Sequence, residues 1–123
     1  MKVISTDKAP AAIGPYSQGI IVNGMLFASG QIAIIPSTGE IKEGSIVEQT
    51  TQVCENIGEL LKAAGIGYEN VVKTTCFLAD MGDFQTFNEI YAKYFVSKPA
   101  RSCVAVKTLP KNVLCEIEVI AEV

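Results

Sequence analysis

The chain has 123 residues, of which 49% are hydrophobic and 19% charged, with a formal net charge of -3. This length suits one domain over residues 1–123 with enough apolar material for a core. Lysine and arginine are scattered singly, so no basic stripe can neutralise a phosphate backbone, and nucleic acid is not expected as a partner. No apolar run approaches a membrane span. Because the mean hydropathy is nevertheless +0.32, we expect surplus apolar surface to be buried at a subunit interface.

The chain contains no histidine, which removes Ser-His-Asp and Cys-His catalysis and the commonest metal ligand together. Its four cysteines show no CxxC spacing, so no metal site and no cofactor are expected. Catalysis would depend on carboxylates, Arg, Lys, Tyr, Cys, backbone groups and water. Residues 1–20 lack the basic start and apolar stretch of a signal peptide, so we expect a cytoplasmic protein with reduced thiols.

Strand patterns predict an α+β domain. Apolar and β-branched residues flank Asn23-Gly24, the two-residue turn typical of a β-hairpin. Strands are expected at Val3 and over residues 19–23, 25–29, 71–78, 101–106 and 114–123. Two helices interrupt this order, so the elements after the short first strand read β, β, α, β, α, β, β.

Each predicted helix has its own start signal. Ser45 and Glu48 have the spacing of a capping box, and Gly65 lies where a C-terminal cap belongs. Asp83 is expected to cap the second helix, and Pro99 ends that segment. The second helix carries an aromatic stripe, which we expect to be core packing against the sheet: Phe84, Phe87, Tyr91 and Tyr94 or Phe95.

Two helices can cover only one face of a five- or six-stranded sheet. The strand over residues 71–78 nevertheless has apolar or small side chains on both faces. The second face is therefore expected to meet other subunits, which predicts an obligate oligomer.

Arg101 stands at the start of an otherwise apolar strand, where its planar fork is placed to bind a carboxylate or phosphate. Strand alternation puts Cys103 on the same face. The last strand places Glu116, Glu118 and Glu122 together on one face. Structural salt bridges and a solvent-facing edge with paired charges remain the alternatives for these residues. Periodicity does not choose which carboxylate would work as acid or base.

The first third of the chain offers three further candidates. Gly30 allows close approach of a ligand or backbone. Ser29 cannot be an elbow nucleophile, because GxSxG and its histidine are both missing. Tyr16 is the lone aromatic of a loop, and on its own it favours a packing role.

Together these segments resemble the Rid family (YjgF/YER057c/UK114) in content, order and spacing. The matching segments are Ala9–Tyr16, Ser29–Gln31, Lys73–Thr75, Asn88, Pro99–Cys103 and Glu116–Glu118. The resemblance covers essentially the whole chain. It implies a chorismate-mutase-like α+β fold with a mixed five- to six-stranded sheet and two helices on one face. It further implies a homotrimer around a central barrel, which binds small carboxylates in three clefts between subunits.

The resemblance also implies an activity, the hydrolysis of 2-iminobutanoate and 2-iminopropanoate to 2-oxo acids and ammonia. Arg101 would grip the substrate carboxylate with help from the backbone at Cys103. Glu116, kept ionised by the guanidinium, would orient and partly deprotonate the attacking water. The remaining substrate-binding residues would be Tyr16, Ser29, Gly30 and Asn88, the last of these holding the cleft together across the interface.

Two other functions compete with this one. A trimer could sense a small carboxylate or bind a regulator without turnover, or the chain could cleave RNA and inhibit translation. Acidity and the missing histidine count against RNA cleavage, and the presence of both Arg101 and Glu116 favours an enzyme over a sensor. The connection Val96–Pro99 is shorter than in many Rid proteins, which leaves the breadth of substrates open.

Overall fold

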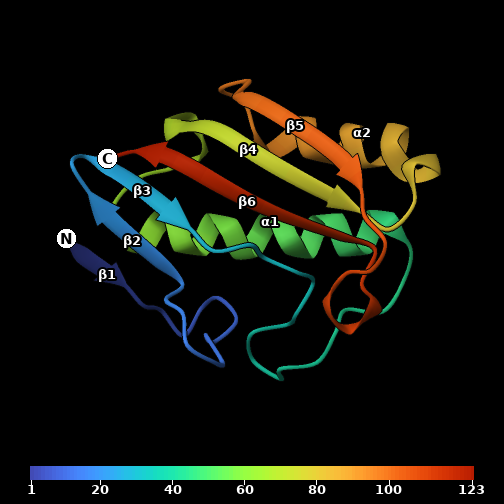
Figure 1. Cartoon of the computed structure of the whole chain (residues 1–123), viewed down its shortest axis with the longest axis horizontal. Coiled ribbons are helices and arrows are strands. Elements are labelled where there is room, and N and C mark those ends of the chain that lie inside the picture. Colours follow the sequence, from blue (N-terminus) through green and yellow to red (C-terminus); the bar gives the residue numbers. More distant parts are fainter.

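Six strands and two helices make up the computed structural model, which describes all of residues 1–123 (Figure 1). The strands are β1 (Lys2–Ile4), β2 (Gly19–Val22), β3 (Met25–Ala28), β4 (Val71–Leu78), β5 (Ala100–Ala105) and β6 (Cys115–Glu122). The helices are α1 (Ile46–Ala63) and α2 (Phe84–Tyr94). The predicted order of elements is confirmed, including the short first strand.

All six strands join one mixed sheet in the order β1-β2-β3-β6-β4-β5. Only β4 and β5 run parallel, and α2 connects them as the crossover that a parallel pair requires. The last strand, β6, lies inside the sheet between β3 and β4, whereas β5 forms a free edge. The prediction of a mixed sheet with two helices is therefore confirmed.

The β2–β3 hairpin turns at the predicted dipeptide. Asn23 and Gly24 both have positive φ, 51° and 73°, as a type I′ turn demands. Val22 and Met25 close the ladder on either side of the turn. The turn chemistry thus fixes the register that sends alternate side chains of both strands toward the core.

The predicted caps of α1 are both present. Ser45 and Glu48 form the full capping box at its start. At its end, Gly65 adopts φ 78°, its N–H donates to the Lys62 carbonyl at 2.9 Å, and the Ile66 N–H donates to Leu61 at 3.0 Å. This pair of hydrogen bonds is a Schellman motif, in which glycine occupies the left-handed position without steric cost.

The prediction that Asp83 caps α2 is wrong. Its side chain makes no cap hydrogen bond, because residues 81–83 form a 3₁₀ turn that runs directly into the helix. Asp83 therefore has helical backbone angles (φ -86°, ψ -2°) in place of the extended conformation that capping needs. The cap lies one turn earlier, at Asp80, whose side chain accepts from the Gly82 N–H at 2.8 Å.

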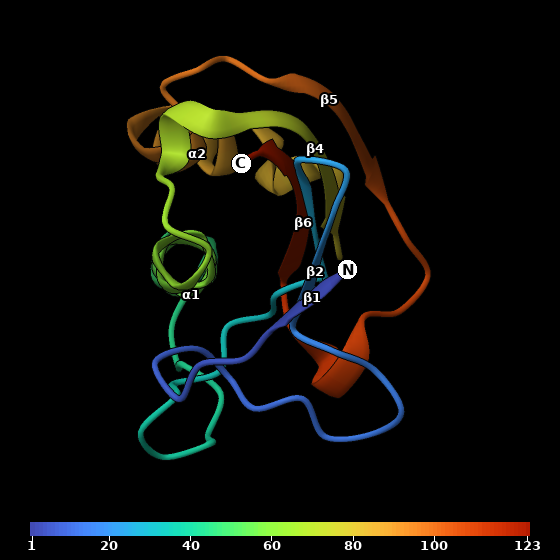
Figure 2. The ribbon, with the colours of Figure 1, turned by 90° about the vertical axis from the view of Figure 1, so that its left-hand side faces the viewer.

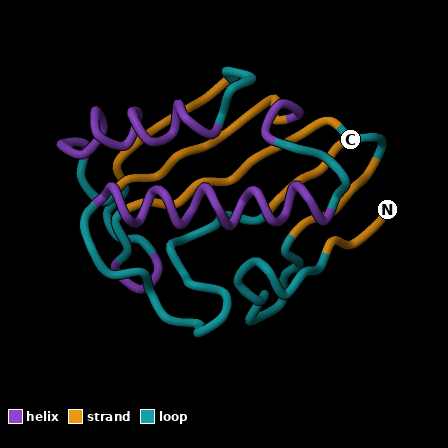
Figure 3. The backbone as a smooth tube through the Cα atoms, turned by 180° about the vertical axis from the view of Figure 1, so that it is seen from behind, coloured by secondary structure: helices purple, strands orange, loops and turns teal.

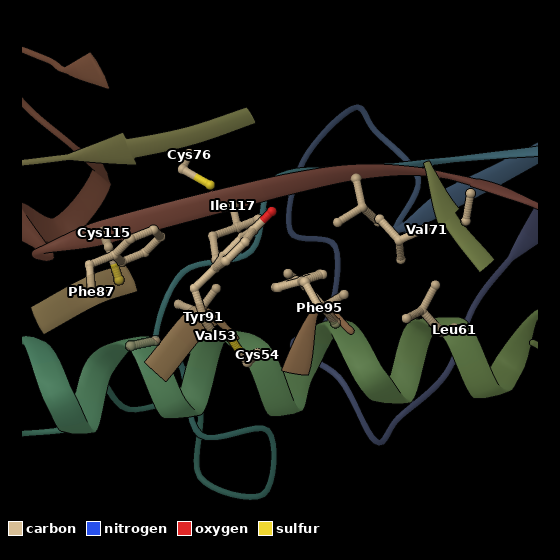
Figure 4. Packing of buried hydrophobic residues seen from close by; sticks show 14 of the residues in the cluster. Val53, Cys54, Leu61, Val71, Cys76, Phe87, Tyr91, Phe95, Cys115 and Ile117 are labelled. Atoms are coloured by element: carbon tan, nitrogen blue, oxygen red, sulfur yellow. The ribbon is translucent and has the colours of Figure 1, made fainter. Parts of the chain in front are cut away.

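Both helices lie on the same side of the sheet, as the side view and the view from behind show (Figures 2 and 3). The core fills the space between these layers (Figure 4). Phe87 and Tyr91 of α2 and Phe95, which directly follows the helix, are buried, so the predicted stripe does pack against the sheet. Burial of each such side chain contributes about 1.5–3 kcal/mol to folding.

The other face of the sheet is uncovered in the single chain (Figure 2). Val3, Phe27 and Val104 are 53%, 46% and 47% exposed. The apolar composition and the presence of only two helices predict that one face of the sheet is left uncovered and apolar, as it is in the structure. Neither helix is at once long enough and apolar enough to cross a membrane.

Candidate functional site

Glu116 lies on the uncovered face of the sheet, at the start of β6. Alternation along β6 buries Cys115 and Ile117 beneath the helices and turns Glu116 the other way. Beside it, the chain after β3 forms a bulge. Residues 28–30 lie opposite residues 118–119, between the Phe27–Ile120 pair and the Gln31–Ile117 bridge. Such bulges re-aim backbone and side chains at the rims of sheets, and here one brings Gly30 against Glu116.

Gly30 and Glu116 touch so closely that a side chain at residue 30 would displace the Glu116 carboxylate. A Cβ built on Gly30 would overlap the Glu116 carboxylate, and its three nearest atoms all belong to the Glu116 side chain. The Gly30 φ does not lie in the left-handed region. Glycine is therefore needed at residue 30 to leave room for the Glu116 carboxylate, and not to allow an unusual backbone conformation.

A recess of about 550 Å³ opens at this contact. Four residues that the sequence singled out line it together: Tyr16, Ser29, Gly30 and Glu116. Ile13 and Gln31 also line it; they lie in the segments that carry the resemblance but were given no role of their own. Sequence reasoning missed Gln18, Ile32, Ile34 and Lys111, which lie outside those segments, so only the folded chain could bring them to the recess.

The electrostatics of the recess raise the pKa of Glu116 above the ordinary carboxyl value. Desolvation by burial is the main cause, and the like charge of Glu118 adds to it. The hypothesis that the Arg101 guanidinium keeps Glu116 ionised is therefore not met within one chain. A raised pKa makes the Glu116 carboxylate a stronger base than an ordinary carboxylate, as a group that takes a proton from water should be.

Gln18 fixes the loop that carries Tyr16. Its buried side-chain amide accepts from the Thr6 N–H at 2.7 Å and donates to the carbonyls of Thr6 and Pro10 at 2.9 and 2.8 Å. The Ser29 hydroxyl donates to the Ser17 carbonyl at 2.6 Å, which ties the same loop to the end of β3. This hydrogen bond leaves the lone pairs of the Ser29 oxygen as acceptors for a ligand.

Replacement of Gly30 by alanine should displace the Glu116 carboxylate. We expect at least about a tenfold loss of turnover, since small misplacements of reacting groups have large kinetic costs. The thermal midpoint should change little, because the backbone at Gly30 accommodates alanine. Gly24→Ala is the control, since a Cβ there has open space and only the positive φ to oppose it. Equal activity in wild type and Gly30→Ala would show that the close contact between Gly30 and Glu116 is not required for turnover.

Arg101 lies on the helix-covered face, where β5 and α2 meet. Its Nη1 donates to the Asn88 Oδ1 at 2.7 Å, and its Cζ lies 4.9 Å from the centre of the Tyr91 ring. The sole ion pair of the chain joins Lys62 and Glu59, so Arg101 has no carboxylate partner. Of the five N–H donors of a guanidinium, one is used within the chain. A partly buried cation with a free fork is suited to an anionic ligand.

The contact of Asn88 differs from the one that the resemblance implies. Asn88 holds Arg101 of its own chain, one turn of α2 before Tyr91. A role across an interface is therefore not needed to explain it.

Free backbone donors lie next to Arg101 along the β5 edge. The Val106 N–H donates to the Leu78 carbonyl at 2.9 Å, so alternate residues of β5 direct their backbone groups to β4. The N–H groups of Arg101 and Cys103 point the opposite way, away from the sheet. Burial raises the pKa of the Cys103 thiol, so the backbone of Cys103 is better suited than its sulfur to contact an anion.

One chain does not bring Arg101 and Glu116 together. Arg101 is the register partner of Thr74, which is buried beneath the helices, whereas Glu116 pairs with Phe77 on the uncovered face. The two residues thus lie on opposite faces of the same sheet. No group of three or more His, Cys, Asp or Glu side chains is placed to hold a metal ion.

Comparison with known proteins finds similar sequences over essentially the whole chain. The model of the family described as endoribonuclease L-PSP matches residues 6–123. The putative regulator AldR of Lactococcus lactis is 60% identical over 100% of this chain and 98% of its own. The mouse 2-iminobutanoate/2-iminopropanoate deaminase is 54% identical over 98% of this chain and 90% of its own.

A solved structure agrees with the computed fold over nearly every residue. The Rid-family protein YyfA of Yersinia pestis superposes with a TM-score of 0.96 at 52% identity, covering 99% of this chain and 98% of that one. The chain therefore belongs to the Rid family, whose family model bears the description endoribonuclease L-PSP.

Proposed function

We propose that this protein hydrolyses reactive 2-imino acids, with 2-iminobutanoate and 2-iminopropanoate as substrates, to 2-oxo acids and ammonia. The observation that carries the proposal is the partly buried Arg101 guanidinium, which has an amide and two aromatic rings around it but no carboxylate. A 2-imino acid supplies the missing carboxylate. The deaminase name of the mouse relative supports the same chemistry.

The active site is shared between subunits of a homotrimer. Arg101 and Glu116 lie on opposite faces of one sheet, so a single small substrate cannot reach both within one chain. The free β5 edge of one subunit, placed against the Glu116 recess of the next, would bring them together. The uncovered apolar face supports such an assembly, because monomers rarely expose contiguous apolar surface. Three copies closed by a threefold axis then contain three equivalent clefts.

The reaction needs no more than these groups. Arg101 binds the substrate carboxylate bidentately and holds the imine carbon C2 in place. Glu116 takes a proton from water as the water oxygen attacks C2, and passes that proton to the imine nitrogen, so that the C=N double bond becomes a carbinolamine. Glu116 then takes the hydroxyl proton of the carbinolamine as the C=O bond forms, and gives it to the nitrogen, which departs as ammonia when the C–N bond breaks. One imine and one water thus give one 2-oxo acid and one ammonia.

The pH profile should report the raised pKa of Glu116. Below this pKa the carboxyl group is protonated and cannot accept a proton, so kcat/KM should fall on the acid side, with a midpoint above the ordinary value of 4.5. Glu118→Gln removes the like charge and should move this acid limb to lower pH. An acid limb that is identical in wild type and Glu118→Gln would contradict this coupling.

The direct test generates the imine in the assay. A threonine dehydratase releases 2-iminobutanoate, and formation of 2-oxobutanoate is followed with and without the protein. Because imines also hydrolyse unaided, the dehydratase alone sets the baseline. The proposal requires a clear rise above this baseline that scales with protein concentration. Appearance of 2-oxobutanoate at the baseline rate would reject it.

A carboxylate-binding regulator is the second candidate, since a relative at 60% identity bears the name putative regulator. The same Arg101 cleft would then bind a 2-oxo acid without turnover. Binding of 2-oxobutanoate together with baseline imine hydrolysis is the result that would favour it.

A further inference from the structure

One face of α2 holds the Arg101 guanidinium in place. Phe84, Asn88 and Tyr91 follow one another at successive turns of the helix and all contact it. The Cζ of Arg101 lies 5.5 Å from the centre of the Phe84 ring and 4.9 Å from that of Tyr91. The negative face of an aromatic ring attracts a cation, so these rings favour a guanidinium lying over them.

Tyr91 is itself fixed on two sides. Its hydroxyl shares a 2.7 Å hydrogen bond with the Thr74 Oγ1, and its ring stacks on Phe95 at a centroid distance of 4.4 Å. Thr74 is fully buried in β4 and is the register partner of Arg101 in β5. Figure 4 shows the Tyr91 side chain reaching from α2 toward the sheet, with its oxygen at the sheet end. Thr74 of β4, the strand next to Arg101, thus fixes the Tyr91 ring on which Arg101 lies.

We propose that Tyr91 is a positioning residue for Arg101, with its ring as the surface on which the guanidinium rests and Thr74 as the anchor of that ring. The aromatic stripe of α2 explains why this position is apolar, but packing alone requires neither a cation over the ring nor a hydroxyl facing Thr74. This inference rests on the proposed function, because it takes Arg101 as the residue that binds the substrate carboxylate.

Asn88 and Tyr91 divide the task between them. The single hydrogen bond from Asn88 fixes the rotation of the guanidinium in its own plane, while the ring below limits its tilt. The remaining N–H donors are then held toward a ligand before it arrives, which reduces the entropy lost on binding. Loss of the ring should weaken the binding of a carboxylate more than it slows the chemical step.

Three variants separate the ring from the hydroxyl. Tyr91→Leu removes both, Tyr91→Phe keeps the ring, and Thr74→Val keeps the shape of threonine but loses the same hydrogen bond. We expect Tyr91→Leu to raise the Kd for 2-oxobutanoate, and the KM for 2-iminobutanoate, by about tenfold, with a smaller effect on kcat. Tyr91→Phe and Thr74→Val should each cost about twofold to fivefold, and together no more than either alone.

Arg101→Lys is the background that distinguishes positioning from general damage. An ammonium offers no planar fork to orient, so Tyr91→Leu should weaken binding much less in that background than in wild type. An equal loss in both backgrounds, or wild-type affinity in Tyr91→Leu, would overturn the proposal. If Tyr91→Leu does not fold, the proposal stands or falls on the non-additivity of Tyr91→Phe and Thr74→Val. Failure of the wild-type protein to bind 2-oxobutanoate would instead reject the proposed function.

Discussion

Arg101→Ala should abolish both substrate binding and turnover. The substitution removes the only cation in the chain that offers a free, partly buried fork to a carboxylate. Charge-assisted bidentate contacts are worth a few kcal/mol, so we expect kcat/KM to fall by at least about 100-fold. The measurement is imine hydrolysis in the dehydratase assay, together with calorimetric titration of 2-oxobutanoate.

Arg101→Lys is the matched variant, since it keeps the charge and loses the fork. It should recover little of the activity, because an ammonium binds carboxylate as a point charge and also loses the hydrogen bond to Asn88. Full activity of Arg101→Ala would remove the basis of the proposed mechanism. Full activity of Arg101→Lys would show that charge alone is required.

Glu116→Gln should lower turnover by about 100-fold or more, the usual contribution of a general base. Glutamine keeps the shape of the side chain and one acceptor oxygen but cannot take a proton from water. Binding of the unreactive 2-oxobutanoate should survive, because Arg101 is untouched. The variant should also be more stable than wild type at neutral pH. A raised pKa means that the fold disfavours the ionised form, which costs stability above that pKa.

Glu118→Gln is the control for Glu116→Gln, two residues along the same strand face. Glu118 is exposed and does not line the recess, so turnover at neutral pH should stay within about twofold of wild type. An essential Glu118 beside a dispensable Glu116 would mean that the wrong carboxylate has been assigned to the water.

Local patterns predicted most elements, because their causes are local. The positive-φ turn at Asn23-Gly24, the capping box at Ser45 and the glycine at residue 65 each act within a few residues of the chain. Alternation along β6 likewise predicted that Glu116 and Ile117 would face opposite ways. Asp83 was assigned wrongly, because Asp80, three residues earlier, caps a 3₁₀ turn that runs directly into α2.

The site itself depended on topology, which the residue pattern does not contain. Strand register shows that Arg101 and Glu116 lie on opposite faces of one sheet, whereas the sequence alone suggested a shared site only through the clefts between subunits that the resemblance implies. Gln18 lies at the end of a loop and belongs to no motif. The sequence therefore could not predict that its side-chain amide would form hydrogen bonds with the backbone of Thr6 and Pro10. Tyr91 matched a core pattern, which concealed its contact with Arg101.

Complementation between two inactive chains tests the shared active site most directly. Arg101→Ala and Glu116→Gln are co-expressed with different tags, and the mixed particles, of about three chain masses by light scattering, are assayed for imine hydrolysis. If each cleft takes Arg101 from one chain and Glu116 from its neighbour, every mixed trimer contains a single cleft with both intact residues, about a third of its clefts. Activity of the mixed particles should therefore return to about a third of the wild-type value. Mixed particles no more active than the separate variants would contradict a site built from two subunits.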